Sequence, residues 1–284
     1  METYTFTAND TSLKKILDYF TDYSTSNNPY IKYLFKNSDV TITVYTNNKV
    51  VIQGKRALSY YEMFNTENKQ VYLPQAGSDE VGTGDFFGPI CVCAAFLDQN
   101  SYSEIKQYHI DDSKKLTDEY IKEITPHIIK TIKYSVLILP NEKYNYLISK
   151  YNLNCLKAIL HNQAYINLIN KGVELPDLAV VDDFCGQDLY YRYLLSQKQV
   201  IKDLTFQTKA ESQYPAVACA SIISRYCFLQ EMEAMSNKYK IELPKGAAPI
   251  TEEIGKIFLQ RYGINELNKV CKMNFKNYQR LFSK

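Results

Sequence analysis

The stretch GSDEVGTGDFFGP, residues 77–89, places two adjacent carboxylates, Asp79 and Glu80, before a glycine-rich turn. The run PICVCAAFL that ends at Leu97 is almost continuously apolar, which is typical of a central strand buried on both faces. The acids are therefore predicted to lie at the end of one strand, where the chain turns back into the core of a sheet.

The glycines of this turn, Gly82 and Gly84, do not fit a dinucleotide-binding loop. That fingerprint needs a third glycine at position 87, which is Phe87, and a helix after the turn rather than a strand. Asp-Glu before glycine is also ordinary turn chemistry, so this segment alone leaves a structural role open.

Two further places carry acids at predicted element ends. The strand 178–181 runs directly into Asp182 and Asp183, and Glu211 stands at the entrance to a helix that begins near Ser212. Taken singly, the aspartates could cap a helix or form a turn, and Glu211 could favour the helix dipole. Each segment alone is at least as well explained by structure as by catalysis.

Together the three segments predict phosphodiester hydrolysis assisted by metal. Two Mg²⁺ or Mn²⁺ ions about 4 Å apart can stabilise the attacking and leaving oxygens of such a reaction. These hard cations prefer carboxylate, phosphate and water oxygens, and the sequence offers no Cys/His set with zinc spacing. Clustered carboxylates repel one another without a cation, so we expect a strained site in the absence of metal.

Hydrophobic periodicity predicts two parts. The first reads strand–helix–strand–strand–strand with a further helix from Arg56, which suggests a small α+β domain over residues 1–64. Residues 65–75 form the predicted linker. Residues 76–284 alternate strands with helices over 118–131, 153–171 and 212–239, which predicts an α/β domain with a mixed sheet flanked by helices.

Several strings in this second part resemble type 2 ribonucleases H in order along the chain. The similarity runs from Gly77 to Asn277, and its motifs are GSDEVGTGDFFGP, DSKKLTDE, NEKYN, LKAILHNQA, VVDDF, TKAES, ASIISRY, LPKGAA and FKN. Thr83 in the glycine turn and the glutamate at position 211 resemble the ribonuclease HIII branch, because ribonucleases HII have arginine and aspartate there. Ala248 departs from the glycine usual in relatives.

The resemblance implies a ribonuclease H-like fold and a small TATA-binding-protein-like N-terminal domain that binds substrate. It implies hydrolysis of the RNA strand of an RNA–DNA hybrid, giving 5′-phosphate and 3′-hydroxyl ends. The implied catalytic and metal-binding carboxylates are Asp79, Glu80, Asp182 and Glu211, and Asp183 is a spectator. Gly82, Thr83 and Gly84 would read the 2′-hydroxyls of the RNA strand.

Three lysines are softer candidates for phosphate contact: Lys114, Lys115 and Lys209. A solvated loop explains them equally well. His161 is interpreted as a structural histidine rather than a metal ligand, because no ligand partner stands three or four residues away.

Charge and cysteine content fit this picture. Residues 255–284 hold seven basic residues and one acid, a net +6, while the other 26 basic and 30 acidic residues give −4. Such a basic end suggests a polyanionic partner. The seven cysteines are an odd number without a CxxC motif, and neither a membrane-spanning run nor a secretory leader is visible. We therefore expect a cytoplasmic protein that acts as a monomer.

Two alternatives stay open. A ribonuclease HII-like specificity would cut at a single ribonucleotide embedded in DNA, and Thr83 argues against it. A non-catalytic nucleic-acid-binding protein could keep the same fold, and the presence of all four carboxylates argues against that.

Overall fold

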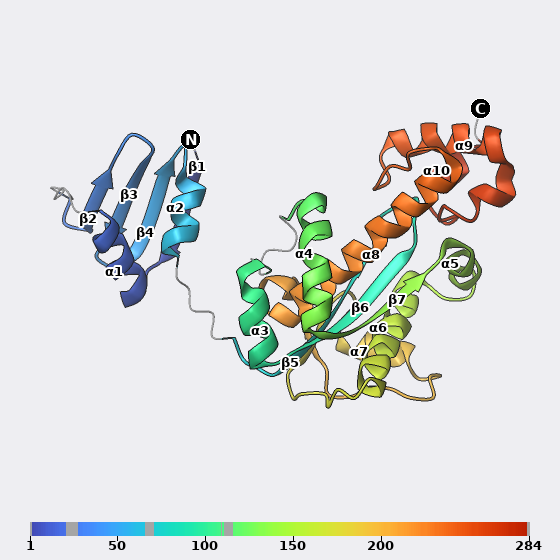
Figure 1. Cartoon of the computed structure of the whole chain (residues 1–284), viewed down its shortest axis with the longest axis horizontal. Helices are drawn as coiled ribbons and strands as arrows, with labels where there is room; N and C mark the ends of the chain where they lie inside the picture. Colours follow the sequence, from blue (N-terminus) through green and yellow to red (C-terminus); the bar gives the residue numbers. More distant parts are fainter. Residues whose placement is uncertain (1, 21–27, 66–70, 109, 111–115, 283–284) are drawn as a thin grey trace. The chain divides into compact units, whose positions relative to one another are not determined.

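A computed structural model of the chain describes residues 2–20, 28–65, 71–108, 110 and 116–282 (Figure 1). Two compact units are present, Met1–Gln70 and Val71–Lys284. Each unit has its own hydrophobic core, and each is described separately below.

The N-terminal unit is an antiparallel four-stranded sheet of order β1-β4-β3-β2 with two helices. Its elements are β1 (Glu2–Thr7), α1 (Asp10–Tyr19), β2 (Ile31–Lys36), β3 (Val40–Tyr45), β4 (Lys49–Gly54) and α2 (Ala57–Phe64). The predicted element order is confirmed. Asn9 caps α1 by accepting a hydrogen bond from Ser12 N at 2.8 Å, as its position before an apolar helical pattern predicts.

The C-terminal unit is built on a mixed five-stranded sheet of order β7-β6-β5-β8-β9. Its strands are β5 (Gln75–Val81), β6 (Ile90–Leu97), β7 (Lys133–Leu139), β8 (Ala179–Asp182) and β9 (Thr205–Gln207). β5, β6 and β7 pair antiparallel, whereas β5, β8 and β9 run parallel. The apolar run after the glycine turn is β6, an interior strand between β7 and β5, and every one of its residues except Phe96 is buried, as the sequence predicts.

Helices cover both faces of this sheet (Figure 1). One face packs against α6 (Leu153–Asn170), and the other packs against the long helix α8 (Pro215–Tyr239). The remaining helical segments are α3 (Gln99–Ile105), η1 (Lys106–Tyr108), α4 (Asp118–Thr131), α5 (Asn141–Ile148), α7 (Gln187–Tyr193), η3 (Ala210–Ser212), α9 (Pro249–Leu267) and α10 (Lys276–Arg280). The predicted mixed α/β architecture is therefore confirmed.

Strand β5 and helix α8 approach each other closely at Gly77. A Cβ added at this glycine would lie 2.3 Å from Val217 N and 2.7 Å from Ala216 C. Any larger residue would push the strand away from the helix, so glycine is required by the packing rather than by a turn. The backbone of α8 therefore lies directly beneath the strand that carries Asp79 and Glu80.

No helix in the described part of the chain is long and apolar enough to cross a membrane. All seven cysteines are free thiols, and five of them are buried. Burial raises the pKa of the Cys227 thiol to about 11 and that of Cys271 to about 12. The buried thiols, Cys91 and Cys93 among them, pack as small apolar groups.

Candidate active site

Two of the predicted acids lie near the carboxyl ends of neighbouring parallel strands. The last registered pair between β5 and β8 is Ser78 with Val181, so Asp79 and Asp182 follow at the same edge of the sheet. Carboxyl ends of adjacent parallel strands are a common position for binding sites in α/β proteins. The sheet thus brings together residues that lie 103 positions apart in the sequence.

Asp79 is buried at 6% exposure. Its Oδ1 accepts a hydrogen bond from the backbone N–H of Glu80 at 2.7 Å, and the side chain also bonds Ser221 of α8. Burial, followed by the charges of Glu80 and Asp182, raises the pKa of Asp79 to about 8 despite these bonds. The strain expected of crowded carboxylates without a cation is therefore concentrated on Asp79.

Glu80 has a different environment, because two basic side chains of α6 bind its two carboxylate oxygens. The ammonium of Lys157 forms an ion pair with Oε1, and His161 Nε2 lies 2.8 Å from Oε2. Burial opposes ionisation here, but the hydrogen bond and charge of His161 and the contact with Lys157 outweigh it and lower the pKa of Glu80. Glu80 is therefore the carboxylate whose charge the protein itself balances.

The acid that ends β8 is fixed to the segment that carries the fourth acid. Ala210 donates its backbone N–H to Asp182 Oδ1 at 2.9 Å, and Glu211 is the next residue, inside η3. Glu211 is buried at 4% exposure. Lys209 adopts a left-handed conformation with φ of 55° where the chain enters η3, and its side chain is exposed.

Asp183 has a structural role in the loop after β8. Its Oδ1 accepts hydrogen bonds from the backbone N–H groups of Cys185 at 3.0 Å and Gly186 at 2.7 Å. These two bonds form the turn that leads into α7, and they agree with the interpretation of Asp183 as a spectator.

The glycine turn after β5 is held by distant parts of the chain. Gly82 has φ of 98°, and a Cβ there would lie 2.2 Å from Pro89 O, whereas a Cβ at Gly84 would meet nothing within 4 Å. Asp85 Oδ1 accepts a hydrogen bond from Gly246 N at 2.6 Å. The fully buried ammonium of Lys272 donates to the carbonyls of Asp85 and Gly88.

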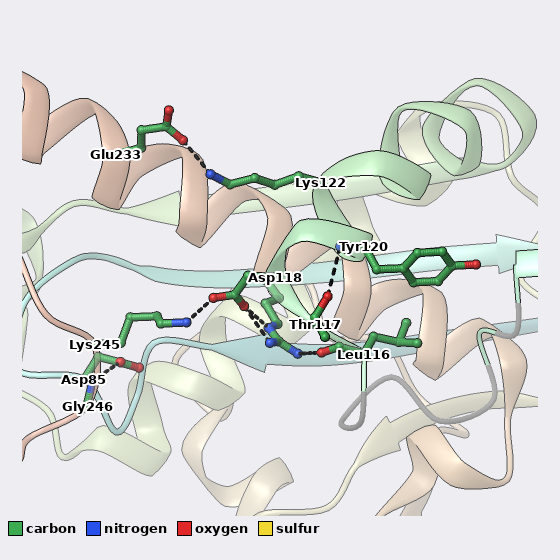
Figure 2. A network of polar contacts seen from close by, with 10 residues as sticks. Asp85, Leu116, Thr117, Asp118, Tyr120, Lys122, Glu233, Lys245 and Gly246 are labelled. Atoms are coloured by element: carbon green, nitrogen blue, oxygen red, sulfur yellow. Dashed lines mark hydrogen bonds and ion pairs between the residues drawn. The ribbon is translucent and has the colours of Figure 1, made fainter.

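A polar network ties the start of α4 to α8 and to the segment before α9 (Figure 2). Asp118 Oδ1 accepts from Arg225 Nε at 3.0 Å and Nη2 at 2.5 Å, and its Oδ2 forms an ion pair with Lys245. Arg225 Nη1 also donates to the carbonyl of Leu116 at 3.0 Å. This network anchors the chain just after residues 111–115, and the candidates Lys114 and Lys115 lie outside the described residues.

Sequence reasoning missed Lys157 as a partner of Glu80, while its interpretation of His161 as hydrogen-bonded and structural agrees with the contacts. Both side chains stand on one face of α6, four residues apart, in a helix whose other buried positions are apolar except for Asn162 and Tyr165. Polar residues at this spacing on a buried helix face are the signal that could have indicated a buried acid opposite them.

The donor set fits a divalent cation, although the side chains are not gathered around one point. Within the described ranges, no group of three or more His, Cys, Asp or Glu side chains is arranged as a ready metal cluster. Glu80 is instead directed towards Lys157 and His161. The oxygen ligands and the raised pKa of Asp79 are what a hard cation would relieve, so the four-carboxylate site stays a prediction that the chemistry supports.

Comparisons with known proteins match both units. A sequence model described as ribonuclease HII matches residues 76–278, and one described as a domain of unknown function matches residues 4–73. The chain is 34% identical over 287 residues to a ribonuclease HIII of Streptococcus pneumoniae strain P1031, covering 99% of each protein.

Solved structures agree with these matches. A crystal structure of Bst-RNase HIII in complex with Mn²⁺ is 33% identical with a TM-score of 0.75, covering 99% of this chain and 98% of the other. The Aquifex aeolicus RNase H3 structure, 24% identical with a TM-score of 0.57, covers 96% and 100% and supports the fold. With its ribonuclease H-like sheet and its similarity to these enzymes over nearly the full length of the chain, the chain belongs to the ribonuclease HIII family of ribonucleases H.

Proposed function

We propose that this ribonuclease hydrolyses the RNA strand of RNA–DNA hybrids at a site formed by Asp79, Glu80, Asp182 and Glu211. The observation that carries the proposal is the register of β5 and β8, which brings Asp79 and Asp182 to one sheet edge beside η3. Asp79 and Glu211 are both buried at this edge, and buried carboxylates are uncommon outside paired or functional sites.

The four carboxylates would hold divalent ions, Mg²⁺ or Mn²⁺ and most simply two of them. Such ions supply Lewis-acid chemistry, which makes water a better nucleophile and offsets the charge that develops on phosphate oxygens. Asp79 would give up its proton to become a ligand, and Ser221 would keep its carboxylate oriented. Ala210 would keep Asp182 oriented through its backbone N–H.

The reaction forms one bond and breaks one. The oxygen of water bonds to phosphorus, and the bond between phosphorus and the 3′-oxygen of the preceding ribose breaks. The water loses a proton and the leaving oxygen gains one, so the products are a 3′-hydroxyl and a 5′-phosphate.

The glycine turn supports recognition of RNA. Gly84 is exposed and Thr83 is half-buried, so backbone groups of this turn are open to a strand that approaches the acids. We propose that Gly82, Thr83 and Gly84 read 2′-hydroxyls, the groups that distinguish RNA from DNA. Lys209 would contact a phosphate beside Glu211, Lys114 and Lys115 would also contact phosphates, and the N-terminal unit, residues 1–64 of the predicted division, would bind the hybrid.

The test is cleavage of a labelled RNA–DNA hybrid with Mg²⁺ or Mn²⁺, beside single-stranded RNA, double-stranded RNA and a DNA duplex with one ribonucleotide. We expect cleavage of the hybrid and a loss of about a hundredfold or more in Asp79→Asn. Asp183→Asn at the next position along the chain from Asp182 is the matched control. Its side-chain amide keeps the Oδ1 acceptor for Cys185 N and Gly186 N, so the variant should cleave the hybrid near the wild-type rate.

Other outcomes would reject the proposal in distinct ways. Efficient cutting at the single ribonucleotide would indicate ribonuclease HII-like specificity. Hybrid binding without cleavage under either metal would indicate a binding protein. Normal cleavage by Asp79→Asn would remove the carboxylate mechanism. The monomeric state and the cytoplasmic location stay predictions.

A further inference from the structure

Glu80 forms an ion pair with Lys157 and a close contact with His161, two basic side chains of α6. Both of its oxygens are engaged, Oε1 by Lys157 and Oε2 by His161. The side chains of Lys157 and His161 are 9% and 0% exposed. A buried ammonium is rare unless it is paired, so Lys157 is placed on α6 for a reason other than solubility.

The two bases are held by different contacts. His161 Nδ1 lies 2.8 Å from Ser78 Oγ, so the ring is fixed between two residues of β5, Ser78 and Glu80. Lys157 Nζ has a second partner, because it lies 3.8 Å from the ring centroid of Phe184 in the loop after β8. The imidazole is therefore tethered at both nitrogens, whereas the ammonium shares its interactions between a carboxylate and an aromatic face.

The Phe184 ring matters because it offers the Lys157 ammonium a second stabilising contact besides Glu80. A lysine that leaves its only carboxylate partner inside a protein is strongly destabilised, because its charge stays buried and unpaired. A cation over an aromatic ring keeps part of its stabilisation when it is desolvated. Lys157 can therefore release Glu80 Oε1 without becoming an unpaired buried charge.

Asp79 and Glu80 differ in the charges that surround them. Asp79 lies next to the carboxylates of Glu80 and Asp182 and carries the crowding, while Glu80 is neutralised by groups of α6. Lys157 supplies positive charge to Glu80, which is also what a bound divalent ion would supply.

We propose that Lys157 is a built-in competitor of the metal: its ammonium holds Glu80 in the metal-free protein and must yield Oε1 when a divalent cation takes that carboxylate. His161 keeps its bond to Oε2 and acts as the positioning residue that orients Glu80. The exchange makes metal binding weaker than the carboxylates alone would allow, and so sets the cation concentration at which the enzyme becomes active. This inference rests on the proposed function, in which Glu80 is a metal ligand.

The test is the affinity of the metal-free full chain for Mn²⁺ and for Mg²⁺, measured by calorimetry without nucleic acid. Lys157→Met removes the charge and keeps the length of the side chain. We expect its Kd to fall about tenfold, which corresponds to about 1.4 kcal/mol. Lys171→Met is the matched control at the opposite, C-terminal end of the same helix, where Lys171 Nζ contacts the carbonyl and ring of Tyr134. Its Kd should equal that of the wild type.

A double-mutant cycle separates competition for Glu80 from a general effect of positive charge. If Lys157 acts through the carboxylate, Lys157→Met should not tighten metal binding in a Glu80→Gln background. Equal tightening in both backgrounds would overturn the proposal, as would an unchanged or higher Kd in Lys157→Met alone.

Thermal unfolding gives a second readout that does not depend on catalysis. Metal-free Lys157→Met should melt below the wild type, because Glu80 loses its buried partner, and metal should raise its Tm by more than it raises the wild-type Tm. If Lys157→Met does not fold, Lys157→Arg tests the same idea, since a bidentate guanidinium should raise the Kd above the wild-type value. A lower Kd in Lys157→Arg would contradict the inference.

Failure of this inference and failure of the proposed function give different results. A wild-type protein without Asp79-dependent metal binding would reject the metal site itself. A wild-type protein that binds metal through Asp79, combined with an unchanged Kd in Lys157→Met, would reject only the role of Lys157.

Discussion

Ala210 and Asp182 are joined by a backbone N–H to Oδ1 hydrogen bond of 2.9 Å that links the end of β8 to η3. The bond orients one acid and at the same time fixes the segment that carries Glu211. Two of the four candidate ligands therefore depend on one contact for their relative positions.

This contact separates two roles of Asp182. Asp182→Asn keeps an acceptor for Ala210 N, so we expect wild-type stability together with loss of hybrid cleavage. Asp182→Ala removes the acceptor as well and should lower the free energy of unfolding by about 1 kcal/mol. Urea unfolding of the metal-free variants and hybrid cleavage assays measure the two effects. Similar activity in Asp182→Asn and wild type would show that the charge is not needed.

The pKa of Asp79, about 8 against a usual value of 3.8, predicts how stability depends on pH. Between these values the folded protein keeps a proton that the unfolded chain has released, so protons bind more strongly to the folded state. The metal-free protein should therefore lose stability as pH rises from about 4 to about 8. Urea unfolding in a chelator measures this slope, and Asp79→Asn should flatten it. An equal slope in both proteins would contradict the assignment.

The two glycines of the turn should respond differently to alanine. Gly82→Ala is strained by φ of 98° and by a Cβ 2.2 Å from Pro89 O, so we expect a loss of about 2 kcal/mol or more in unfolding free energy. Gly84→Ala meets no atom within 4 Å and should change stability by less than about 0.5 kcal/mol.

Gly84→Ala should nevertheless raise KM for the hybrid several-fold, because the added methyl lies where the RNA backbone would approach. Steady-state cleavage of hybrid by a variant of normal stability is the measurement. An unchanged KM would remove Gly84 from the proposed contact surface.

The network around Asp118 predicts a contrast between two ion pairs (Figure 2). Asp118→Ala removes the acceptor shared by Arg225 and Lys245, in a site where the Asp118 side chain is 21% exposed, and should cost about 1.5–3 kcal/mol of stability. Glu233→Ala breaks the ion pair with Lys122, whose side chains are 54% and 41% exposed, and should cost at most about 0.5 kcal/mol. Chemical unfolding of both variants tests this, and equal losses would mean that burial does not govern these pairs.

The local patterns predicted most of the fold. The apolar run of β6 and the helical spacing in α6 are strong periodic signals, so their positions could be predicted within a few residues. The acids Asp79 and Asp182 were found because each interrupts a chain segment that otherwise reads as buried. Their proximity could not follow from periodicity, since it depends on the register of two strands that the sequence separates widely.

Side-chain contacts between elements that are distant in the sequence could not be predicted for the same reason. The pairing of Lys157 with Glu80 depends on how α6 is rotated against β5, which no local pattern fixes. Lys272 is the clearest case, because the basic composition of the tail suggested a polyanionic partner for it. The structure instead buries Lys272 completely and uses it to bind two carbonyls beneath the glycine turn. Composition counts charges but does not say which of them face water.

The parallel pairing of β5 with β8 also determines when the enzyme can first work during its synthesis. β8 is synthesised about a hundred residues after β5, and Ser221 of α8, which bonds Asp79, is synthesised later still. Because long-range pairings form only when both partners are available, a nascent chain that ends before β8 should hold its acids apart. We expect nuclease activity only in chains long enough to include β8, Glu211 and Ser221.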